Sequence, residues 1–153
     1  MLELNVWSRR SAFEALWAKP FILEALKDLP EFDTAICPCC GFPTLAERNA
    51  FGWCLLCLWE DDGQDDPDAD EITGGPNHQY SLSHARANFS KYLSMYSPDD
   101  QHCKKLSTAT KTELIAEYTS LLGANNKVEA VAACLRIKEL LKKLWQQATY
   151  PPD

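Results

Sequence analysis

The stretch CPCCGFPTLAERNAFGWCLLCLWEDD spans residues 37–62 and contains two CxxC pairs separated by 13 residues. A CxxC turn directs both sulfurs toward one point, and two such turns facing each other supply four tetrahedral ligands. Gly41 fits this arrangement, because the backbone after the second cysteine needs a positive φ to aim N–H groups at sulfur. The pattern predicts a closed structural zinc (Zn²⁺) site, and its ligands are Cys37, Cys40, Cys54 and Cys57. Four thiolates leave no open position for water, so the ion is expected to stabilise the fold rather than hydrolyse a substrate.

The chain has seven cysteines, and an odd count with two CxxC pairs favours metal binding over a disulfide framework. Cys39 lies inside the first pair, and we expect its side chain to point away from the metal, into the core or to solvent. Cys134 is predicted to be a small core residue of the last helix. Cys103 is assigned no role.

The formal net charge of −7 is unevenly distributed. Residues 1–100 hold 17 Asp and Glu against 7 Lys and Arg, whereas residues 101–153 hold 5 against 8. An acidic first part is a poor surface for a phosphate backbone and suits a basic protein partner, so nucleic acid is disfavoured as a ligand. No run is apolar enough for a membrane span and no leader pattern opens the chain, so we expect a cytoplasmic protein without a membrane partner.

Composition divides the chain into a helical segment 1–33, a cysteine-containing segment 34–96 and a helical segment 97–153, together expected to form one compact unit. The fold class predicted is α+β and mostly helical: a small zinc-ribbon-like four-cysteine β-module packed against N- and C-terminal helices. Two short strands are expected within residues 34–59, followed by a loop over residues 60–77.

Helix starts and ends are predicted from capping signals. Ser11 with Glu14, and Thr110 with Glu113, have the spacing of a capping box, and Pro20 interrupts the first helix. Ser81 is expected to cap a helix to about residue 95, and Asn126 one to about residue 147. Gly123 is expected to be a left-handed C-cap. The apolar stripe predicted for the last helix consists of Val128, Val131, Leu135, Leu141 and Leu144, with Ile137 partly filling its one wider step and Trp145 widening its end.

Eight carboxylates crowd into residues 60–71, which contain no Lys or Arg. They form a solvated loop, a surface for a basic partner, or a calcium or magnesium site, and the spacing disfavours the metal site. Trp53, Trp59 and Tyr80 are candidate aromatic anchors. The candidate partner-binding residues are Trp59, Glu60, Asp61, Asp62, Asp65, Asp66, Asp68, Asp70 and Glu71. His78 is the candidate catalytic base, but no nucleophile with a matching acid accompanies it, so no catalytic residue is assigned.

The ordered motifs CPCCG (37–41), CLLCLWEDD (54–62), GGPN (74–77) and SLSHAR (81–86) resemble the bacterial family named for its cysteine-rich CPCC motif. The chain departs from that family at His84, where an acidic residue usually precedes the Ala-Arg pair. The resemblance implies a small protein of bacterial accessory loci, some of which lie beside polymorphic toxins and would encode immunity proteins.

Three functions follow as hypotheses. The first is a non-enzymatic zinc-binding immunity protein that neutralises a cognate antibacterial toxin. The second is a zinc-ribbon nucleic-acid-binding or regulatory module. The third is a metal-dependent enzyme that uses the acidic loop and His78.

Overall fold

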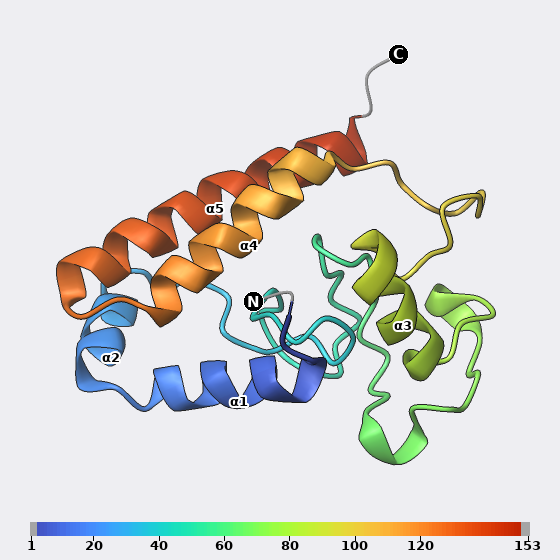
Figure 1. Cartoon of the computed structure of the whole chain (residues 1–153), viewed down its shortest axis with the longest axis horizontal. Coiled ribbons are helices and arrows are strands. Elements are labelled where there is room, and N and C mark those ends of the chain that lie inside the picture. The colour runs from blue at the N-terminus through green and yellow to red at the C-terminus, as the bar shows by residue number, and fades with distance from the viewer. Residues whose placement is uncertain (1–2, 151–153) are drawn as a thin grey trace. The chain divides into compact units, whose positions relative to one another are not determined.

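The computed structural model describes residues 3–150, which fall into two compact units (Figure 1). The helical unit comprises residues 3–32 and 106–150, and the cysteine unit is Asp33–Lys105. The expectation that all segments form one compact unit stays a prediction. Within the described residues, no helix combines the length and apolar composition that a membrane crossing requires.

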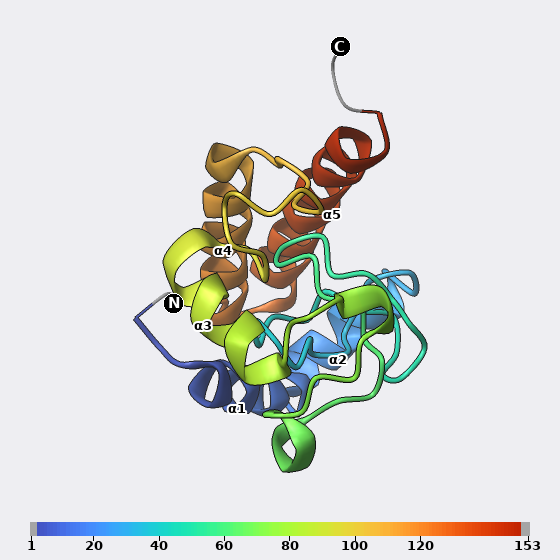
Figure 2. The same cartoon turned by 90° about the vertical axis from the view of Figure 1, so that its right-hand side faces the viewer.

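The helical unit consists of four helices: α1 (Val6–Trp17), α2 (Pro20–Lys27), α4 (Thr108–Leu122) and α5 (Lys127–Thr149). Helices α4 and α5 run side by side and are joined by a short turn, as Figures 1 and 2 both show. Phe13 of α1 meets Tyr118 of α4 edge to face, with ring centroids 5.7 Å apart. Both rings are fully buried, so this pair contributes to the core of the helical unit.

Two of the four predicted N-terminal helix caps are wrong. Helix α1 begins at Val6, where the side chain of Asn5 accepts a hydrogen bond from the Ser8 amide at 2.8 Å. Val6 is buried, and its burial extends the helix upstream of Ser11. Helix α4 likewise begins one turn early, because the Ser107 hydroxyl caps the Thr110 amide. The predicted caps at Ser81 and Asn126 are confirmed.

The buried stripe of α5 differs from the predicted one. Val128 and Leu135 are 79% and 48% exposed, and Trp145 is 50% exposed. The buried positions are Ala130, Ala133, Cys134, Ile137, Leu140, Leu144 and Ala148. Because alanine side chains are small, the face of α5 that contains them can approach a neighbouring helix closely. The buried face is therefore rotated away from Val128 and Leu135. Gly123 does end α4, but its φ of −89° is right-handed, so the predicted left-handed cap is wrong.

The cysteine unit is built mainly from turns around one helix, α3 (Leu82–Tyr92), with two short 3₁₀ turns, η1 (Asp66–Asp68) and η2 (Gly75–Asn77). In place of the two expected strands, the described residues contain only the isolated antiparallel bridges Ala35↔Leu45 and Trp53↔Glu60. The β-module is therefore not confirmed, and the chain is mostly helical with a compact cluster of cysteines. Tight turns around the cysteines occupy the residues that strands would need.

Candidate metal centre

The two cysteine pairs lie in turns with the same backbone design, which we call the first knuckle (residues 37–42) and the second knuckle (residues 54–59). In the first, the amide of Cys37 donates to the carbonyl of Phe42 and the amide of Gly41 donates back to the carbonyl of Cys37, both at 2.9 Å. In the second, the Cys54 amide donates to the Trp59 carbonyl at 2.9 Å and the Leu58 amide to the Cys54 carbonyl at 2.7 Å. Each turn therefore closes on itself and aims its two sulfurs the same way.

The residue after each second cysteine has a left-handed backbone. Gly41 has a φ of 78°, as its sequence position predicts, and Leu58 has a φ of 73°. Glycine adopts this conformation without strain, whereas leucine does so only when its surroundings hold it there. Leu58 is 1% exposed, so packing of its side chain holds the turn in place.

The knuckles bring the four predicted ligands together. The sulfurs of Cys37, Cys40, Cys54 and Cys57 all lie within 4.8 Å of one another, and all four residues are fully buried. Two of the sulfur–sulfur distances, Cys37 to Cys57 and Cys40 to Cys54, are 3.7 Å. A tetrahedron with metal–sulfur bonds of about 2.3 Å has an edge of about 3.8 Å. The four thiol groups thus could hold one metal ion in a closed tetrahedral site.

Hydrogen-bond donors surround the sulfurs. The Thr44 hydroxyl donates to Cys54 Sγ at 3.0 Å, and the Cys57 amide reaches the same sulfur at 3.4 Å. The Trp59 amide donates to Cys57 Sγ at 3.4 Å. Such contacts orient the ligands and spread the negative charge of thiolates, which is the usual role of the groups around metal ligands.

Burial governs the acidity of these thiols. Burial raises the pKa of Cys40, and raises the pKa of Cys37 and Cys57 well above the ordinary value of a thiol. Burial opposes ionisation of Cys54 too, but hydrogen bonds from the other three cysteines and from Thr44 outweigh it and lower the pKa of Cys54 well below the usual range. Because buried negative charge is costly, full ionisation of the cluster needs a compensating cation, which a divalent metal supplies.

The other three cysteines lie outside the cluster. Cys39 is 1% exposed, so it lies in the core rather than in solvent, and it is not one of the four clustered cysteines; that its side chain points away from the metal stays a prediction. Cys134 is buried in α5, as predicted, and burial raises its pKa to about 11. Cys103 is half-buried.

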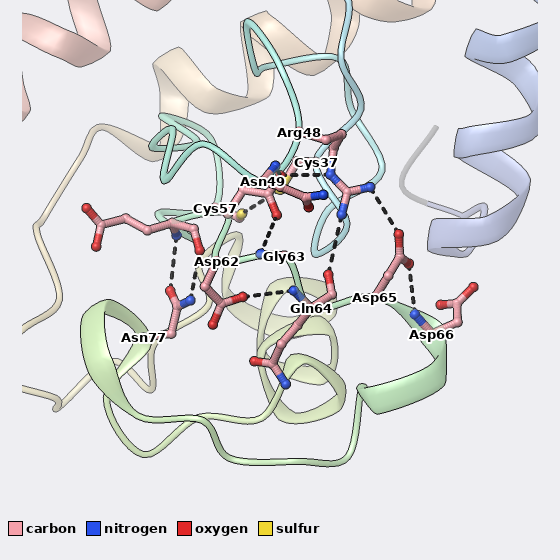
Figure 3. Close-up of polar contacts among 12 residues, drawn as sticks. Cys37, Arg48, Asn49, Cys57, Asp62, Gly63, Gln64, Asp65, Asp66 and Asn77 are labelled. Atoms are coloured by element: carbon pink, nitrogen blue, oxygen red, sulfur yellow. Dashed lines mark hydrogen bonds and ion pairs between the residues drawn. The ribbon is translucent and has the colours of Figure 1, made fainter.

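The acidic loop is anchored from within by Arg48, which the sequence analysis missed (Figure 3). Its Nε donates to Asp61 Oδ2 at 2.8 Å and its Nη1 to Asp65 Oδ2 at 3.0 Å. The amides of Asn49 and Gly63 also donate to the Asp61 carboxylate, at 2.8 and 3.3 Å. Although burial opposes its charge, these hydrogen bonds and the two carboxylates raise the pKa of Arg48. The only signal in sequence was a lone arginine between the cysteine pairs.

Most other carboxylates of the loop also bond to the chain itself. Asp62 accepts from the Gln64 amide and from the Thr73 hydroxyl, and Asp70 accepts from Ser83. Arg86 Nη2 lies 2.8 Å from Asp66 Oδ1. In the described residues, the four cysteines are the only gathered group of three or more metal-ligating side chains, and no loop carboxylate belongs to such a group.

Asn77 and Arg86 join distant motifs of the cysteine unit. The side chain of Asn77 clamps the backbone of Glu60, accepting from its amide at 3.0 Å and donating to its carbonyl at 2.8 Å (Figure 3). The guanidinium of Arg86 donates through Nε to the carbonyl of Pro38 in the first knuckle at 2.9 Å. The GGPN and SLSHAR motifs thus support the metal centre.

Three of the residues predicted to contact a partner are buried, which corrects that prediction. Trp59 and Asp61 are both 0% exposed, so they cannot form part of a surface that a partner contacts directly. Tyr80 is 7% exposed and donates its hydroxyl proton to Asp100 Oδ2 at 2.6 Å. The hydrophobic core and the internal hydrogen bonds use these side chains, which leaves Trp53 as the remaining aromatic anchor candidate.

His78 follows the GGPN turn and is not a member of the four-cysteine cluster. Its backbone has φ 54° and ψ −125°, an unusual conformation for a residue with a side chain. Its ring stacks on that of His102, with centroids 3.9 Å apart. His84 lies in the first turn of α3, where its amide donates to the capping Ser81 hydroxyl.

Comparison with known proteins yields one match. A family model described as "Cysteine-rich CPCC" matches residues 35–111, which is 77 of the 153 residues. The matched range contains both knuckles, the acidic loop and α3. No curated protein and no solved structure matches the chain.

Proposed function

The chain belongs to the cysteine-rich CPCC family, and from that premise we propose that it is a non-enzymatic zinc-binding protein that recognises a basic protein partner. The partner we propose is an antibacterial toxin domain, which the chain neutralises as an immunity protein. The observation that carries this proposal is a buried four-thiol cluster inside a unit that holds all of the chain's net negative charge.

Zinc is the metal that fits the cluster best. Four thiolates in a tetrahedral arrangement suit zinc or iron, whereas hard cations such as calcium and magnesium prefer oxygen ligands. A site closed by four sulfurs supplies folding stability and leaves no position for substrate. The support for zinc is the donor set, the 3.7 Å sulfur–sulfur distances and the complete burial of the four residues.

Charge supports a basic partner. Residues 33–105 hold 12 Asp and Glu against 5 Lys and Arg, which accounts for the whole net charge of −7, since the rest of the chain holds 10 of each. Opposite surface potentials raise the rate at which proteins associate and favour the correct partner. The same charge disfavours nucleic acid, whose binding depends on Lys and Arg contacts to phosphate.

A non-enzymatic role is proposed because the candidate catalytic groups are used elsewhere. Asp61 is buried against Arg48, and Asp62 bonds to its own loop. The ring of His78 stacks on that of His102. None of these groups forms a nucleophile–base pair of the kind that covalent catalysis needs.

Metal analysis tests the zinc site. Protein purified in reductant should contain one zinc per chain by inductively coupled plasma mass spectrometry. Cys40→Ser should abolish stoichiometric zinc, whereas Cys39→Ser, the matched substitution of the neighbouring buried cysteine, should retain it. Stoichiometric iron in place of zinc, or equal zinc in both variants, would contradict the assignment.

Co-expression tests the partner. The chain should form a 1:1 complex with the toxin domain encoded beside its gene, detected by size-exclusion chromatography, and should relieve that domain's toxicity. The complex should weaken above about 0.5 M salt, where exposed charges are screened. Toxicity that persists in the presence of a folded, zinc-loaded chain would overturn the immunity role.

A further inference from the structure

A cleft of about 530 Å³ opens within the cysteine unit beside the second knuckle. Its lining includes Trp53, Glu60, His78, Tyr96, His102 and Lys104. The volume falls within the range of about 300–1,000 Å³ that is typical of ligand pockets. Every lining residue belongs to the cysteine unit, so the cleft is a property of that unit alone.

One wall combines an aromatic ring with a carboxylate. Trp53 and Glu60 face each other across an antiparallel bridge, and residues paired in this way project their side chains on the same face. The indole Nε1 of Trp53 donates to the carbonyl of Leu58 at 3.2 Å, which fixes the plane of the ring. An aromatic face beside a carboxylate is the combination that recognises organic cations.

A second wall of the cleft is held by hydrogen bonds and ring stacking. The Asn77 clamp on the backbone of Glu60 ties this wall to the first one, and the His78 amide donates to the carbonyl of Gly75 at 3.1 Å. The ring of His78 then stacks on that of His102, with 22° between the ring planes. His102 is oriented in turn, since its Nδ1 lies 3.0 Å from Asp100 Oδ1. The cleft is thus lined by flat rings whose positions are already fixed.

The electrostatics of the cleft favour a cation. The Glu60 carboxylate forms no hydrogen bond or ion pair with any other described residue, whereas the loop carboxylates Asp61, Asp62 and Asp65 are all engaged. Burial and the negative charges of Asp100 and Glu60 raise the pKa of Tyr96 to about 12. Lys104 is the basic side chain of the lining, and it is exposed.

A planar organic cation fits this lining better than a metal ion. Within residues 3–150 the carboxylate and imidazoles of the cleft do not gather as metal ligands do. A guanidinium group is flat, weakly hydrated and always charged, and it both stacks on aromatic faces and donates two parallel hydrogen bonds to a carboxylate. A lysine ammonium is a compact point charge that uses neither feature.

We infer that this cleft receives the guanidinium group of an arginine side chain carried by a basic protein partner. Glu60 accepts the guanidinium N–H groups, Trp53 stacks on one face of the group, and the rings of His78 and His102 form the other boundary. This inference rests on the proposed function, because it names the contact through which the acidic unit engages its partner.

The test uses the zinc-loaded full chain and a small probe, N-acetyl-arginine methylamide. In ¹H–¹⁵N correlation spectra, the probe should shift the Trp53 indole and His102 amide signals in a saturable manner. The citrulline analogue has the same shape without the charge and should leave both signals unmoved at the same concentration. Assignment of the indole signal follows from its absence in Trp53→Phe.

Charge variants separate the cleft from a general acidic surface. Glu60→Gln should weaken binding of the probe about fivefold, and Lys104→Gln should strengthen it about twofold, by removing an attractive and a repulsive charge respectively. Glu71→Gln is the matched control, because Glu71 is exposed, carries the same charge and lies outside the lining, so it should change little. The amide spectrum of each variant verifies its fold.

Two outcomes would overturn the inference: equal shifts with the citrulline analogue, or equal affinities of the Glu60→Gln and Glu71→Gln proteins. Failure here is distinguishable from failure of the proposed function. A chain that binds the arginine probe but leaves toxicity unrelieved upholds the cleft and refutes the immunity role. Neutralisation unaffected by Glu60→Gln upholds the immunity role and refutes the cleft.

Discussion

At residue 58 the second knuckle has a leucine where the first has Gly41, although both backbones are left-handed. Two effects oppose each other there. A left-handed backbone costs a non-glycine residue about 1–2 kcal/mol, and removing a buried leucine side chain costs about 2–5 kcal/mol. Packing therefore wins over strain at this position.

We expect Leu58→Gly to lower the free energy of unfolding of the zinc-loaded chain by about 1–3 kcal/mol, the difference between these effects. Gly41→Ala should lower it by about 1 kcal/mol, because alanine must adopt the same positive φ without any gain. Urea unfolding monitored by tryptophan fluorescence measures both. A Leu58→Gly protein more stable than the natural chain would show that strain, and not packing, dominates the turn.

Arg48 and Asp61 form a second residue-level feature, an ion pair between a fully buried carboxylate and a guanidinium 2.8 Å away. Removing one partner of a buried ion pair leaves an uncompensated charge and costs about 3–5 kcal/mol. Arg48→Met should therefore destabilise the chain by about 3 kcal/mol in urea unfolding, since Asp61 keeps two amide donors.

A double-mutant cycle isolates the pair. In an Asp61→Asn background, Arg48→Met should cost much less, because no buried charge is left without a partner. Equal costs in the two backgrounds would mean that Arg48 acts only through its contacts to Asp65 and to the carbonyl of Gln64.

At the scale of the elements, the N-terminal cap of helix α1 can be tested by mutation. Asn5 accepts the Ser8 amide, whereas Ser11 lies exposed within the helix. Asn5→Ala should cost about 1 kcal/mol through loss of the cap, and Ser11→Ala should be neutral or stabilising by up to about 0.5 kcal/mol. Thermal unfolding of the two variants compares them directly, and a larger loss from Ser11→Ala would restore the capping box expected from sequence.

The elements of the cysteine unit depend on side chains more than on regular backbone pairing. The β-pairing among its described residues is limited to two isolated bridges. Single backbone bonds, such as that from the Met95 amide to the Cys57 carbonyl at 2.7 Å, and side chains such as Asn77 and Arg86 join its other segments. A unit with little regular structure has few cooperative backbone hydrogen bonds, so we expect its stability to rest on its core and on the proposed metal ion.

At the scale of the whole molecule, the cysteine unit has little regular structure whereas the helical unit is built from four helices. We therefore expect the two units to respond separately to metal removal. Chelation of zinc should unfold the cysteine unit, because four buried thiols lose their compensating cation. The helical unit contains α1, α2, α4 and α5 and none of the ligands, so most of the helical signal should persist.

Far-ultraviolet circular dichroism measured with an excess of chelator, together with limited proteolysis, tests this prediction. Cleavage should appear within residues 33–105 while residues 3–32 and 106–150 stay protected. Readdition of zinc should restore resistance to protease. Loss of all helical signal in a single step would show that the two units fold as one cooperative unit.

The sequence by itself determined which four cysteines gather and the caps at Ser81 and Asn126, since a CxxC spacing and a capping side chain act within a few residues of each other. It also determined that Gly41 needs a positive φ. These features are local, and local geometry follows from covalent spacing.

Only the tertiary structure decided which acidic and aromatic residues face solvent. Nothing in the pattern WEDD distinguishes the buried Trp59 and Asp61 from the half-buried Glu60, because burial depends on Arg48 and Asn77, which approach from 12 or more residues away. The buried face of α5 was set in the same way, by its packing in the helical unit, which buries Ile137, Leu140 and Leu144 but leaves Val128 and Leu135 exposed. The cleft beside the second knuckle likewise exists only because distant turns are tied together there, and no periodicity along the chain encodes such long-range contacts.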